Sequence, residues 1–337
     1  AMTIYDIPKK AGVSIATVSR VLNGSENVRP STRKKVMDVI DKYDYTPNAF
    51  ARGMGLHSLK TIGILCADSS DLFLAKAVYF LEQELQANGY ESLLCCTGYN
   101  PDIKKNYLNL ILSKKVDSII LVGSHFIGFN EDENQYIKDV STQVPIMLLN
   151  ASFDHPNVYS TLCDDYGTMF EAATEMIQSG ITDILYLYDS KSYSGLKKLH
   201  GFCDAMKEHN IPGFEKLIHF YDGNIEHLNE VADFVARIAT KGTSFHGIMT
   251  SDDSLAIGSI KYAQKKGIRI PEELSVMGYN NSMLTNCCTP ELTSVDNRLE
   301  TQTHQLVQTL LGVLAGEEMP KKSIFSGKII KRGSTLF

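Results

Sequence analysis

A short segment near the N-terminus, YDIPKKAGVSIATVSRVLNG from Tyr5 to Gly24, carries side chains well suited to contact a nucleic acid. An arginine can reach base edges in the major groove of DNA, and small hydroxyl or amide side chains can bond to phosphates or bases. Arg20 supplies the guanidinium group of this segment. The hydroxyl and amide groups belong to Ser14, Thr17, Ser19 and Asn23. These residue types at this spacing predict a surface that binds DNA.

The elements that position these groups can be read from the apolar spacing. Ser14 is suited to cap a short helix that starts at Ile15, and Asn23-Gly24 supplies a left-handed stop after Leu22. A small helical core requires apolar partners on neighbouring helices. The core candidates are Val18, Val21 and Leu22 on this helix, Ile7 and Ala11 before it, and Val36, Val39 and Ile40 after it. Three helices with a glycine in the first turn have the helix-turn-helix layout, in which the second helix enters the major groove.

Pro8 lies where the first helix of this unit is expected. Proline is costly inside a helix but tolerated in its first turn, where the missing amide hydrogen has no acceptor to lose. A cap at Thr3 places Pro8 beyond the first turn, whereas a cap at Asp6 places it within that turn. We therefore expect the first helix to begin near Asp6 or to be distorted at Pro8.

Electric charge is divided unevenly along the 337-residue chain, whose net charge is −6. Residues 1–60 hold ten Lys and Arg against five Asp and Glu, and the remainder holds 23 against 34. A basic first segment on an acidic body is typical of a protein that offers only that segment to a polyanion. A solvated lysine face gives the same count, so charge alone leaves both interpretations open.

From Thr61 onward, short apolar strand-like runs alternate with longer amphipathic runs. This rhythm predicts parallel sheets that are covered by helices on both faces. The run is too long for one core, so we expect two doubly wound lobes with a cleft at the carboxyl ends of their strands. The expected break falls near residues 154–160, and a helix near residues 300–314 is expected to return to the first lobe.

Three motifs resemble the DNA-binding head of the LacI/GalR family of bacterial transcriptional regulators. They are T-I-Y-D-I-P-x-x-A-G-V-S-I-A-T-V-S-R-V-L-N-G, V-R-P-S-T-R-K-K-V and Y-T-P-N-A-F-A-R. The resemblance implies a small all-α helix-turn-helix head and an α/β two-lobed, periplasmic-binding-protein-like body with doubly wound parallel sheets. It also implies a sequence-specific regulator, most simply a repressor, whose affinity for operator DNA changes when a small ligand binds.

The resemblance also assigns segments and roles. The head would span residues 1–46, the first lobe 61–159 and about 293–320, and the second lobe 160–292 and about 321–337. Ile15, Ala16 and Arg20 would read bases, with Thr3 among the further DNA contacts; simple packing is the alternative for Ile15 and Ala16. Pro8 departs from the alanine that is usual in the family.

Residues 47–60 resemble the family's hinge, a short helix that forms on DNA and wedges an apolar side chain into the minor groove. Asn48, Ala51 and Met54 would contact DNA, with Met54 in the wedge position where leucine is usual. Gly53 weakens any isolated helix here. A flexible linker with an incidental methionine is the alternative.

Polar residues at strand ends nominate the ligand pocket of the body. The segment ADSSDLF resembles a family motif, and asparagine stands at two strand ends where the family often has a carboxylate that holds sugar hydroxyls. Lys198 replaces a usual arginine and so loses planar bidentate reach. The effector candidates are Asp68, Ser70, Asp71, Phe73, Asn150, Lys198, Ser251, Asp252 and Asn280. Helix capping is the alternative for Ser70, Asp71, Ser251 and Asp252.

The class of ligand is left open between a sugar and an anion. These strand ends carry fewer acids than is usual in the family, and Lys191, Lys197 and Lys198 lie near a helix start. Such a pocket would suit an anion such as a sugar phosphate. A neutral sugar is the preferred alternative, with the lysines pointing into water. Calorimetric titration with paired sugars and sugar phosphates separates the two.

Other functional classes are disfavoured by the sequence. No hydrolase, zinc-protease, P-loop or complete dinucleotide-binding motif is present, and the nine histidines lack metal-ligand spacing, so no enzyme, metal or cofactor is expected. No signal-like or membrane-spanning apolar run occurs, which favours a cytoplasmic protein over a transport receptor. The resemblance implies a homodimer and not a tetramer, because some relatives form tetramers through an apolar heptad tail and no such repeat is found here. Action through a protein co-regulator stays open.

The seven cysteines, without a C-x-x-C pair, are expected to be buried free thiols.

Overall fold

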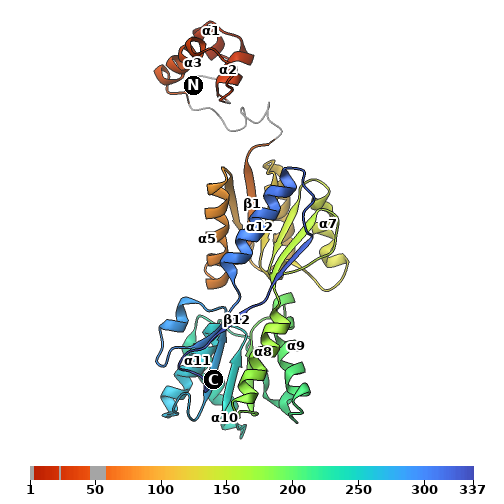
Figure 1. Cartoon of the computed structure of the whole chain (residues 1–337), viewed down its shortest axis with the longest axis vertical. Helices are drawn as coiled ribbons and strands as arrows, with labels where there is room; N and C mark the ends of the chain where they lie inside the picture. The colour runs from red at the N-terminus through yellow and green to blue at the C-terminus, as the bar shows by residue number, and fades with distance from the viewer. Residues whose placement is uncertain (1–3, 23, 46–57) are drawn as a thin grey trace.

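The computed structural model describes residues 4–22, 24–45 and 58–337. They form a small helical head and two α/β lobes (Figure 1). We call the lobe that contains β1 (Thr61–Cys66) lobe 1 and the lobe that contains the C-terminus lobe 2. This architecture confirms the fold class that the sequence predicts.

The head consists of three helices around its own apolar core. They are α1 (Ile7–Ala11), α2 (Ile15–Leu22) and α3 (Pro30–Lys42). The buried side chains of this core are Ile7, Ala11, Val18, Val21, Val36 and Ile40. The core positions that were predicted on α1 and α3 therefore all lie in this core or pack against it.

Pro8 sits within the first turn of α1, and Asp6 occupies the N-cap position. The proline therefore removes no hydrogen bond that the helix could make there. Gly12 ends the helix in a left-handed conformation with φ of 65°, a conformation that glycine adopts without a steric penalty. The prediction that the first helix begins near Asp6 is confirmed.

Lobe 1 contains a parallel sheet with strand order β11-β5-β4-β3-β1-β2. Alternate residues of its central strands point to opposite faces, so that Ile120 and Val122 belong to one core and Ile119 and Leu121 to the other. Helices α5 and α12 cover the first face, and α6 and α7 cover the second. The further elements of lobe 1 are α5 (Leu72–Ala87), β2 (Glu91–Cys96), α6 (Pro101–Ser113), β3 (Ser118–Val122), α7 (Gln135–Ser141), β4 (Ile146–Leu149), β5 (Val158–Cys163), α12 (Leu299–Leu314) and β11 (Lys322–Phe325).

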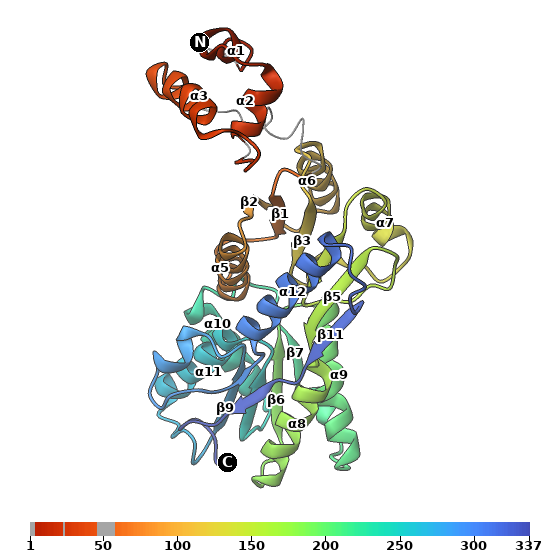
Figure 2. The same cartoon turned by 45° about the horizontal axis from the view of Figure 1, so that its top comes forward.

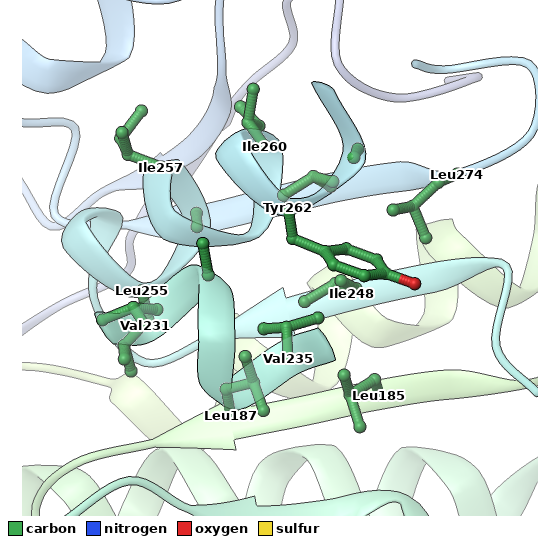
Figure 3. Packing of buried hydrophobic residues seen from close by; sticks show 14 of the residues in the cluster. Leu185, Leu187, Val231, Val235, Ile248, Leu255, Ile257, Ile260, Tyr262 and Leu274 are labelled. Atoms are coloured by element: carbon green, nitrogen blue, oxygen red, sulfur yellow. The ribbon is translucent and has the colours of Figure 1, made fainter. Parts of the chain in front are cut away.

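Lobe 2 contains a second sheet with strand order β12-β10-β9-β8-β6-β7, parallel except for the β10 and β12 pair. Leu185, Leu187 and Ile248 of the sheet pack against Val231 and Val235 of α10 (Figure 3). Helix α11 completes this core, and α8 and α9 cover the opposite face. The elements of lobe 2 are α8 (Asp165–Gln178), β6 (Ile184–Tyr188), α9 (Tyr193–Glu208), β7 (Ile218–Phe220), α10 (Leu228–Thr240), β8 (Gly247–Thr250), α11 (Asp253–Lys266), β9 (Ser275–Tyr279), β10 (Thr293–Asp296) and β12 (Lys328–Ile330).

The chain passes between the lobes after β5, after β10 and between β11 and β12 (Figure 2). Three expected boundaries are therefore wrong. All of β5 pairs in the sheet of lobe 1, although the boundary was expected at 159; β10 pairs in lobe 2, and β11 pairs in lobe 1. An apolar run shows that a strand exists, but only its hydrogen-bonding partner decides which sheet it joins. Helix α12 packs on lobe 1 as expected.

No helix within the described residues is long and apolar enough to cross a membrane.

The seven cysteines are free thiols, as expected, but Cys96 and Cys287 are exposed. The expectation that the thiols are buried is therefore wrong for these two residues.

Candidate functional site

Helix α2 presents a face of accessible side chains away from the head core. Ile15 is 43% exposed, and Ala16 and Arg20 are exposed as well, whereas Val18 and Val21 are buried on the opposite face. The alternative that Ile15 and Ala16 only pack in the core is wrong, because neither side chain belongs to it. This face combines two apolar contacts with one guanidinium group, which is a combination that can read a major groove.

The start of α2 is held by hydroxyl groups. The Thr17 backbone N–H donates to Ser14 Oγ over 3.2 Å, and the Ser14 and Thr17 hydroxyls are 2.9 Å apart. Ser14 therefore caps α2, as the sequence predicts. The capped end also fixes the angle at which Ile15 and Ala16 are presented.

The head also carries several exposed basic side chains on its other elements. Lys10 donates a hydrogen bond to the hydroxyl of Tyr43 over 3.3 Å, and this bond is the main reason that the pKa of Tyr43 lies below its ordinary value. The other exposed basic residues of the head are Lys9, Arg29, Lys34, Lys35 and Lys42. Such groups suit contacts with phosphates, which orient a protein on DNA without reading its sequence.

A chain of three cavities lies between the lobes, at the carboxyl ends of their strands. A central cavity of about 100 Å³ shares walls with two flanking cavities of about 640 and 590 Å³. Asp252 lines all three cavities. Phe73 and Asn280 separate the central cavity from the larger flank, and Tyr99 and His125 border the other.

Three carboxylates from different elements converge on the central cavity. Asp71 precedes α5, Asp189 follows β6, and Asp252 precedes α11. Burial raises the pKa of Asp189 to about 6, with the charge of Asp252 as a further cause. Burial likewise raises the pKa of Asp71. The cavity therefore brings carboxyl groups together in a buried place, which raises their pKa values. Perturbed pKa values of this kind are typical of functional sites.

Two of these carboxylates also cap helices. Asp71 accepts a hydrogen bond from the Leu74 backbone N–H over 2.9 Å, and Asp252 accepts one from the Ser254 N–H over 2.7 Å. Asp68 accepts bonds from both the N–H and the hydroxyl of Ser70, and the hydroxyl bond is the main reason that the pKa of Asp68 is lowered. Capping and cavity lining are thus compatible, because each carboxylate has two oxygens.

Lys198 forms a cationic part of the cavity wall although it is only 8% exposed. Its ammonium group donates to the Ser251 carbonyl oxygen over 3.1 Å and lies 4.2 Å from the centroid of the Tyr279 ring. The Tyr279 hydroxyl in turn donates to Asp165 over 2.5 Å. Lys198 is therefore held by a carbonyl group and an aromatic face, with a carboxylate behind the ring.

Asn150 and Asn280 end β4 and β9 in left-handed conformations, with φ of 69° and 94°. Asparagine adopts positive φ more readily than most residues, so the strand ends can turn sharply and leave the amide at the cavity. Asn280 donates to Asp252 over 3.3 Å and accepts from Asn297 over 3.1 Å. Its amide thus connects a cavity carboxylate to the chain that crosses back to lobe 1.

The wall from lobe 1 is aromatic. The rings of Tyr99 and His125 meet edge to face with centroids 4.8 Å apart. Burial, followed by the charge of Lys104, lowers the pKa of His125 to about 4, so its imidazole is neutral near pH 7. The Lys104 ammonium group donates to the His125 carbonyl oxygen over 2.5 Å.

The two lobes touch directly beside the central cavity. Ser124 of lobe 1 donates to Ser192 of lobe 2 over 2.7 Å, and Ser190 donates to the same oxygen over 2.8 Å. Tyr193, at the start of α9 in lobe 2, packs against the core of lobe 1. This contact joins the two lobes at the wall of the central cavity.

Comparison with known proteins identifies this architecture. Residues 3–48 match the model of bacterial regulatory proteins of the lacI family, and residues 173–335 match a periplasmic-binding-protein-like domain. An HTH-type transcriptional regulator of Lachnoclostridium phytofermentans is 49% identical over 336 residues, which cover 100% of both chains. The chain belongs to the lacI family of bacterial regulatory proteins.

Solved structures of lacI-family proteins share the fold. The lac repressor dimer bound to operator and the anti-inducer ONPF superposes with a TM-score of 0.87 at 20% identity and covers 100% of this chain and 99% of its own. The regulator CelR in complex with cellobiose gives a TM-score of 0.70 at 20% identity and covers 99% of this chain and 100% of its own. At this identity the likeness concerns the fold alone.

Membership of the lacI family makes this protein a DNA-binding transcriptional regulator. The structure places the candidates Ile15, Ala16 and Arg20 on one accessible side of α2, and Ser14 and Thr17 at its start. Ser19 is half-buried on the same helix. The predictions for Thr3, Asn23, Asn48, Ala51 and Met54, including the hinge, lie outside the described residues.

All effector candidates of this lacI-family chain line the cavities between the lobes. Their roles as ligand contacts stay predictions, whereas their convergence is a feature of the fold. The central cavity is lined by Asp71, Phe73, Asn150, Lys198, Ser251, Asp252 and Asn280, and one flank is lined by Asp68 and Ser70.

Asparagine does stand at the ends of β4 and β9, as predicted, yet three carboxylates line the central cavity. Asp189, which was not among the predicted residues, lies there with Asp71 and Asp252. Lys191 and Lys197 are exposed and do not line the described cavities; their ammonium groups lie 4.7 Å from the Phe220 ring and 5.6 Å from the Tyr193 ring. Of the three lysines that suggested an anion, Lys198 alone reaches the central cavity.

Sequence reasoning also missed Tyr99 and His125, and it missed four of the serines that line the central cavity: Ser124, Ser190, Ser192 and Ser194. Tyr99 follows β2, His125 follows β3, and Asp189 follows β6. The signal that could have found them is their position just after a strand, the same signal that nominated Asn150 and Asn280.

Proposed function

We propose that this regulator is a dimeric repressor whose affinity for a near-palindromic operator is modulated by a neutral sugar or sugar derivative bound between the lobes. The accessible face of α2, with Ile15, Ala16 and Arg20, on a head that also carries exposed basic residues, is the observation that carries the DNA-binding part. Two such faces in a dimer would enter successive major grooves about 34 Å apart. Repression would follow because a bound dimer occupies DNA that other proteins need.

The chemistry of the central cavity supports a neutral polyhydroxylated ligand. Sugar hydroxyls can donate to the carboxylates of Asp71, Asp189 and Asp252, and the amide of Asn150 can both donate and accept. The Tyr99 ring offers an apolar face. A phosphate group would instead face three carboxylates, which costs Coulomb energy in a partly buried site. The fold relative CelR was solved with cellobiose.

The central cavity is small compared with its flanks, and a sugar bound there would extend into at least one of them. The flank that contains Asp68 and Glu226 has no Lys or Arg among its described lining residues. A negatively charged ligand is therefore disfavoured at that opening as well. The opposite flank carries Lys76, Arg298 and Lys328 along with acids.

An apolar surface on lobe 1 supports the dimer. Leu93 and Leu94 on the edge strand β2 are 40% and 47% exposed, and Tyr79 on the neighbouring α5 is 51% exposed. Large apolar side chains that cluster on one edge commonly mark a protein interface. We assign this surface, which we call the β2 edge, to contact with a second copy of the chain.

Ligand binding would act by changing how the two lobes close. The Ser124 to Ser192 bond and the packing of Tyr193 join the lobes at the cavity. A ligand that favours one degree of closure shifts the equilibrium by its difference in affinity for the two states. Both signs of coupling, release from DNA and promotion of binding, are possible outcomes of the test.

Selection of bound duplexes from random DNA, with and without candidate sugars, tests the whole proposal. We expect a near-palindromic site and a change in its recovery when a neutral sugar is present. Parallel calorimetric titration of matched sugars and sugar phosphates isolates the ligand part. Tighter binding of the phosphorylated member contradicts the neutral-sugar proposal, and the absence of any selected site contradicts operator binding.

A further inference from the structure

Arg33 differs from the other basic side chains of the head in its degree of burial. Among the Lys and Arg residues that the structure describes in the head, Arg33 alone is half-buried, and the others are exposed. Its neighbour on α3, Lys34, pairs with Asp38 of the same helix over 3.0 Å. The guanidinium group of Arg33 instead donates through Nη2 to the carbonyl oxygen of Ser25 over 2.5 Å. Because Ser25 lies in the turn that follows α2, this bond ties α3 to that turn.

Two backbone hydrogen bonds close the turn after α2. The Ser25 N–H donates to the carbonyl oxygen of Arg20 over 3.0 Å, and the Gly24 N–H donates to that of Val21 over 3.1 Å. Gly24 adopts a left-handed conformation with φ of 71°. This is the Schellman pattern, which supplies partners for carbonyl groups in the last turn of a helix. The turn therefore holds the backbone of Arg20.

Together these bonds form a continuous connection from α3 to the backbone of Arg20. Arg33 donates to Ser25, and Ser25 donates in turn to Arg20. Helix α2 is eight residues long and buries Val18 and Val21 in the head core. Two buried side chains on one stripe of so short a helix leave it some freedom to tilt. A polar bond beyond its C-terminal end adds a third point of support.

The position of α2 matters because base recognition tolerates little displacement. A bidentate contact from an arginine to a guanine needs two hydrogen bonds at once, and a recognition group must be held within about 0.5 Å of its productive place. We propose that Arg33 is a positioning residue for base reading, which fixes the C-terminal end of α2 through Ser25 and makes no phosphate contact. This inference rests on the proposed role of Arg20 and is independent of the ligand.

A phosphate contact is the alternative role for a guanidinium group on the head, and the two roles predict different behaviour. Loss of one phosphate contact weakens binding to every duplex and lowers the salt dependence of log affinity by about 0.9 per contact. Loss of a positioning residue weakens binding to the operator, relaxes discrimination between bases and leaves the salt dependence unchanged. Salt dependence and base discrimination thus separate the two roles.

Arg33→Met in the full-length protein tests the proposal, because methionine keeps an apolar stem and lacks the donors. Fluorescence anisotropy measures affinity for the selected operator, for its single-base variants and for a duplex without the site, over a range of salt concentrations. We expect operator affinity to fall about tenfold, as for loss of a hydrogen bond from a charged group. Discrimination should relax at the base pair where Arg20→Ala relaxes it, and the salt dependence should not change.

Equal losses on the operator and on the duplex without the site, with a lower salt dependence, overturn the proposal in favour of a phosphate contact. Unchanged operator affinity and discrimination overturn it as well. Arg20→Ala is measured in parallel. If Arg20→Ala leaves discrimination intact, the proposed role of α2 fails and the inference fails with it. If Arg20→Ala relaxes discrimination and Arg33→Met does not, the inference alone fails.

Lys34→Met is the matched control, because it removes the same charge from the next residue of the same helix, where the side chain is exposed. This variant should keep its discrimination between bases. An equal relaxation in Lys34→Met would show that the charge of α3, and not the bond to Ser25, is responsible, which overturns the proposal.

Arg33→Lys keeps the charge, but its shorter side chain ends in a compact ammonium group that stops short of the Ser25 oxygen. Discrimination should relax in this variant, and the salt dependence should be retained. Operator affinity and discrimination equal to those of the unchanged protein would overturn the proposal, because a phosphate contact tolerates lysine. If Arg33→Met unfolds the head, which loss of binding to the duplex without the site reveals, Arg33→Lys decides the question.

Discussion

Arg20 is the residue through which α2 is expected to distinguish one base sequence from another, because it is exposed beside Ile15 and Ala16. Replacing Arg20 by alanine removes a donor pair that can contact a guanine. We expect operator binding to weaken by about 1–3 kcal/mol and discrimination at one position of each half-site to relax. Fluorescence anisotropy with the selected operator and its single-base variants measures both effects.

Arg237→Ala is the matched control for charge. Arg237 is exposed on α10 in lobe 2, so its removal changes the net charge by the same amount without touching the head. Operator affinity should stay within the error of the measurement for this variant. An equal loss in both variants would show that charge in general, and not the face of α2, determines binding.

Asp189 makes the proposed sugar binding sensitive to pH. Its pKa of about 6 means that the carboxylate is ionised above that pH and increasingly protonated below it. The ionised form accepts stronger hydrogen bonds from hydroxyl groups, so affinity should rise as pH increases through about 6. Below it, binding should weaken by up to about tenfold per pH unit. Calorimetry between pH 5 and pH 8 measures this dependence.

Asp189→Asn separates this carboxylate from the other titrating groups around the cavity. The amide keeps the shape of the side chain but does not ionise. Ligand affinity should be lower at pH 8 and should lose most of its change through pH 6. An unaltered profile in this variant would assign the dependence to Asp71 or to Asp253, because burial also raises the pKa of Asp71 and raises that of Asp253 to about 7. His125, with a pKa of about 4, remains neutral across the range.

At the scale of elements, the contact between α8 and α9 depends on a glycine. A Cβ atom at Gly201 would lie 2.3 Å from the carbonyl oxygen of Tyr166 on α8. Gly201→Ala must therefore push the two helices apart and loosen the core that Phe202 helps to fill. We expect a loss of roughly 1–3 kcal/mol in the free energy of unfolding, measured by urea titration.

Lys207→Ala serves as the control on the same helix, because Lys207 is exposed near the C-terminal end of α9. Its stability should differ little from that of the unchanged protein. Equal stability of Gly201→Ala and the unchanged protein would mean that α8 and α9 can move apart without cost, against the close packing seen between them.

At the scale of the whole molecule, the β2 edge is expected to hold the dimer together. Leu94→Glu places a charge on the exposed edge strand, where burial against a second copy would leave it unpaired. We expect dimerisation to weaken at least about tenfold, which corresponds to ~1.4 kcal/mol, and operator affinity to fall with it. Analytical ultracentrifugation over a range of concentrations measures the dissociation constant.

The opposite edge of the same sheet supplies the comparison. Ile324 on β11 is 55% exposed, and β11 and β2 are the two outer strands of lobe 1. Ile324→Glu introduces the same charge and should leave the dimer unchanged. If Ile324→Glu gives monomers and Leu94→Glu does not, the dimer interface lies at the β11 edge and not at the β2 edge.

The sequence by itself determined the features that depend on near neighbours in the chain. Helix caps such as Ser14 and the alternation of strands with helices follow from local geometry and apolar period, and the same reasoning limited the first helix to a start near Asp6 or a distortion at Pro8. The family motifs extended the same local information to the face of α2 that we propose reads bases. These features need no knowledge of which distant segments meet.

Tertiary structure alone decided which segments meet. Strand pairing placed β5 and β11 in lobe 1 and β10 in lobe 2, because the partner across the hydrogen bonds selects the sheet. Folding then brought Asp189, Tyr99 and His125 beside the residues that the motifs nominated, and it buried Asp189 enough to raise its pKa. Burial and the distance between charges are properties of the folded chain, so no local pattern could supply the acidity of the cleft.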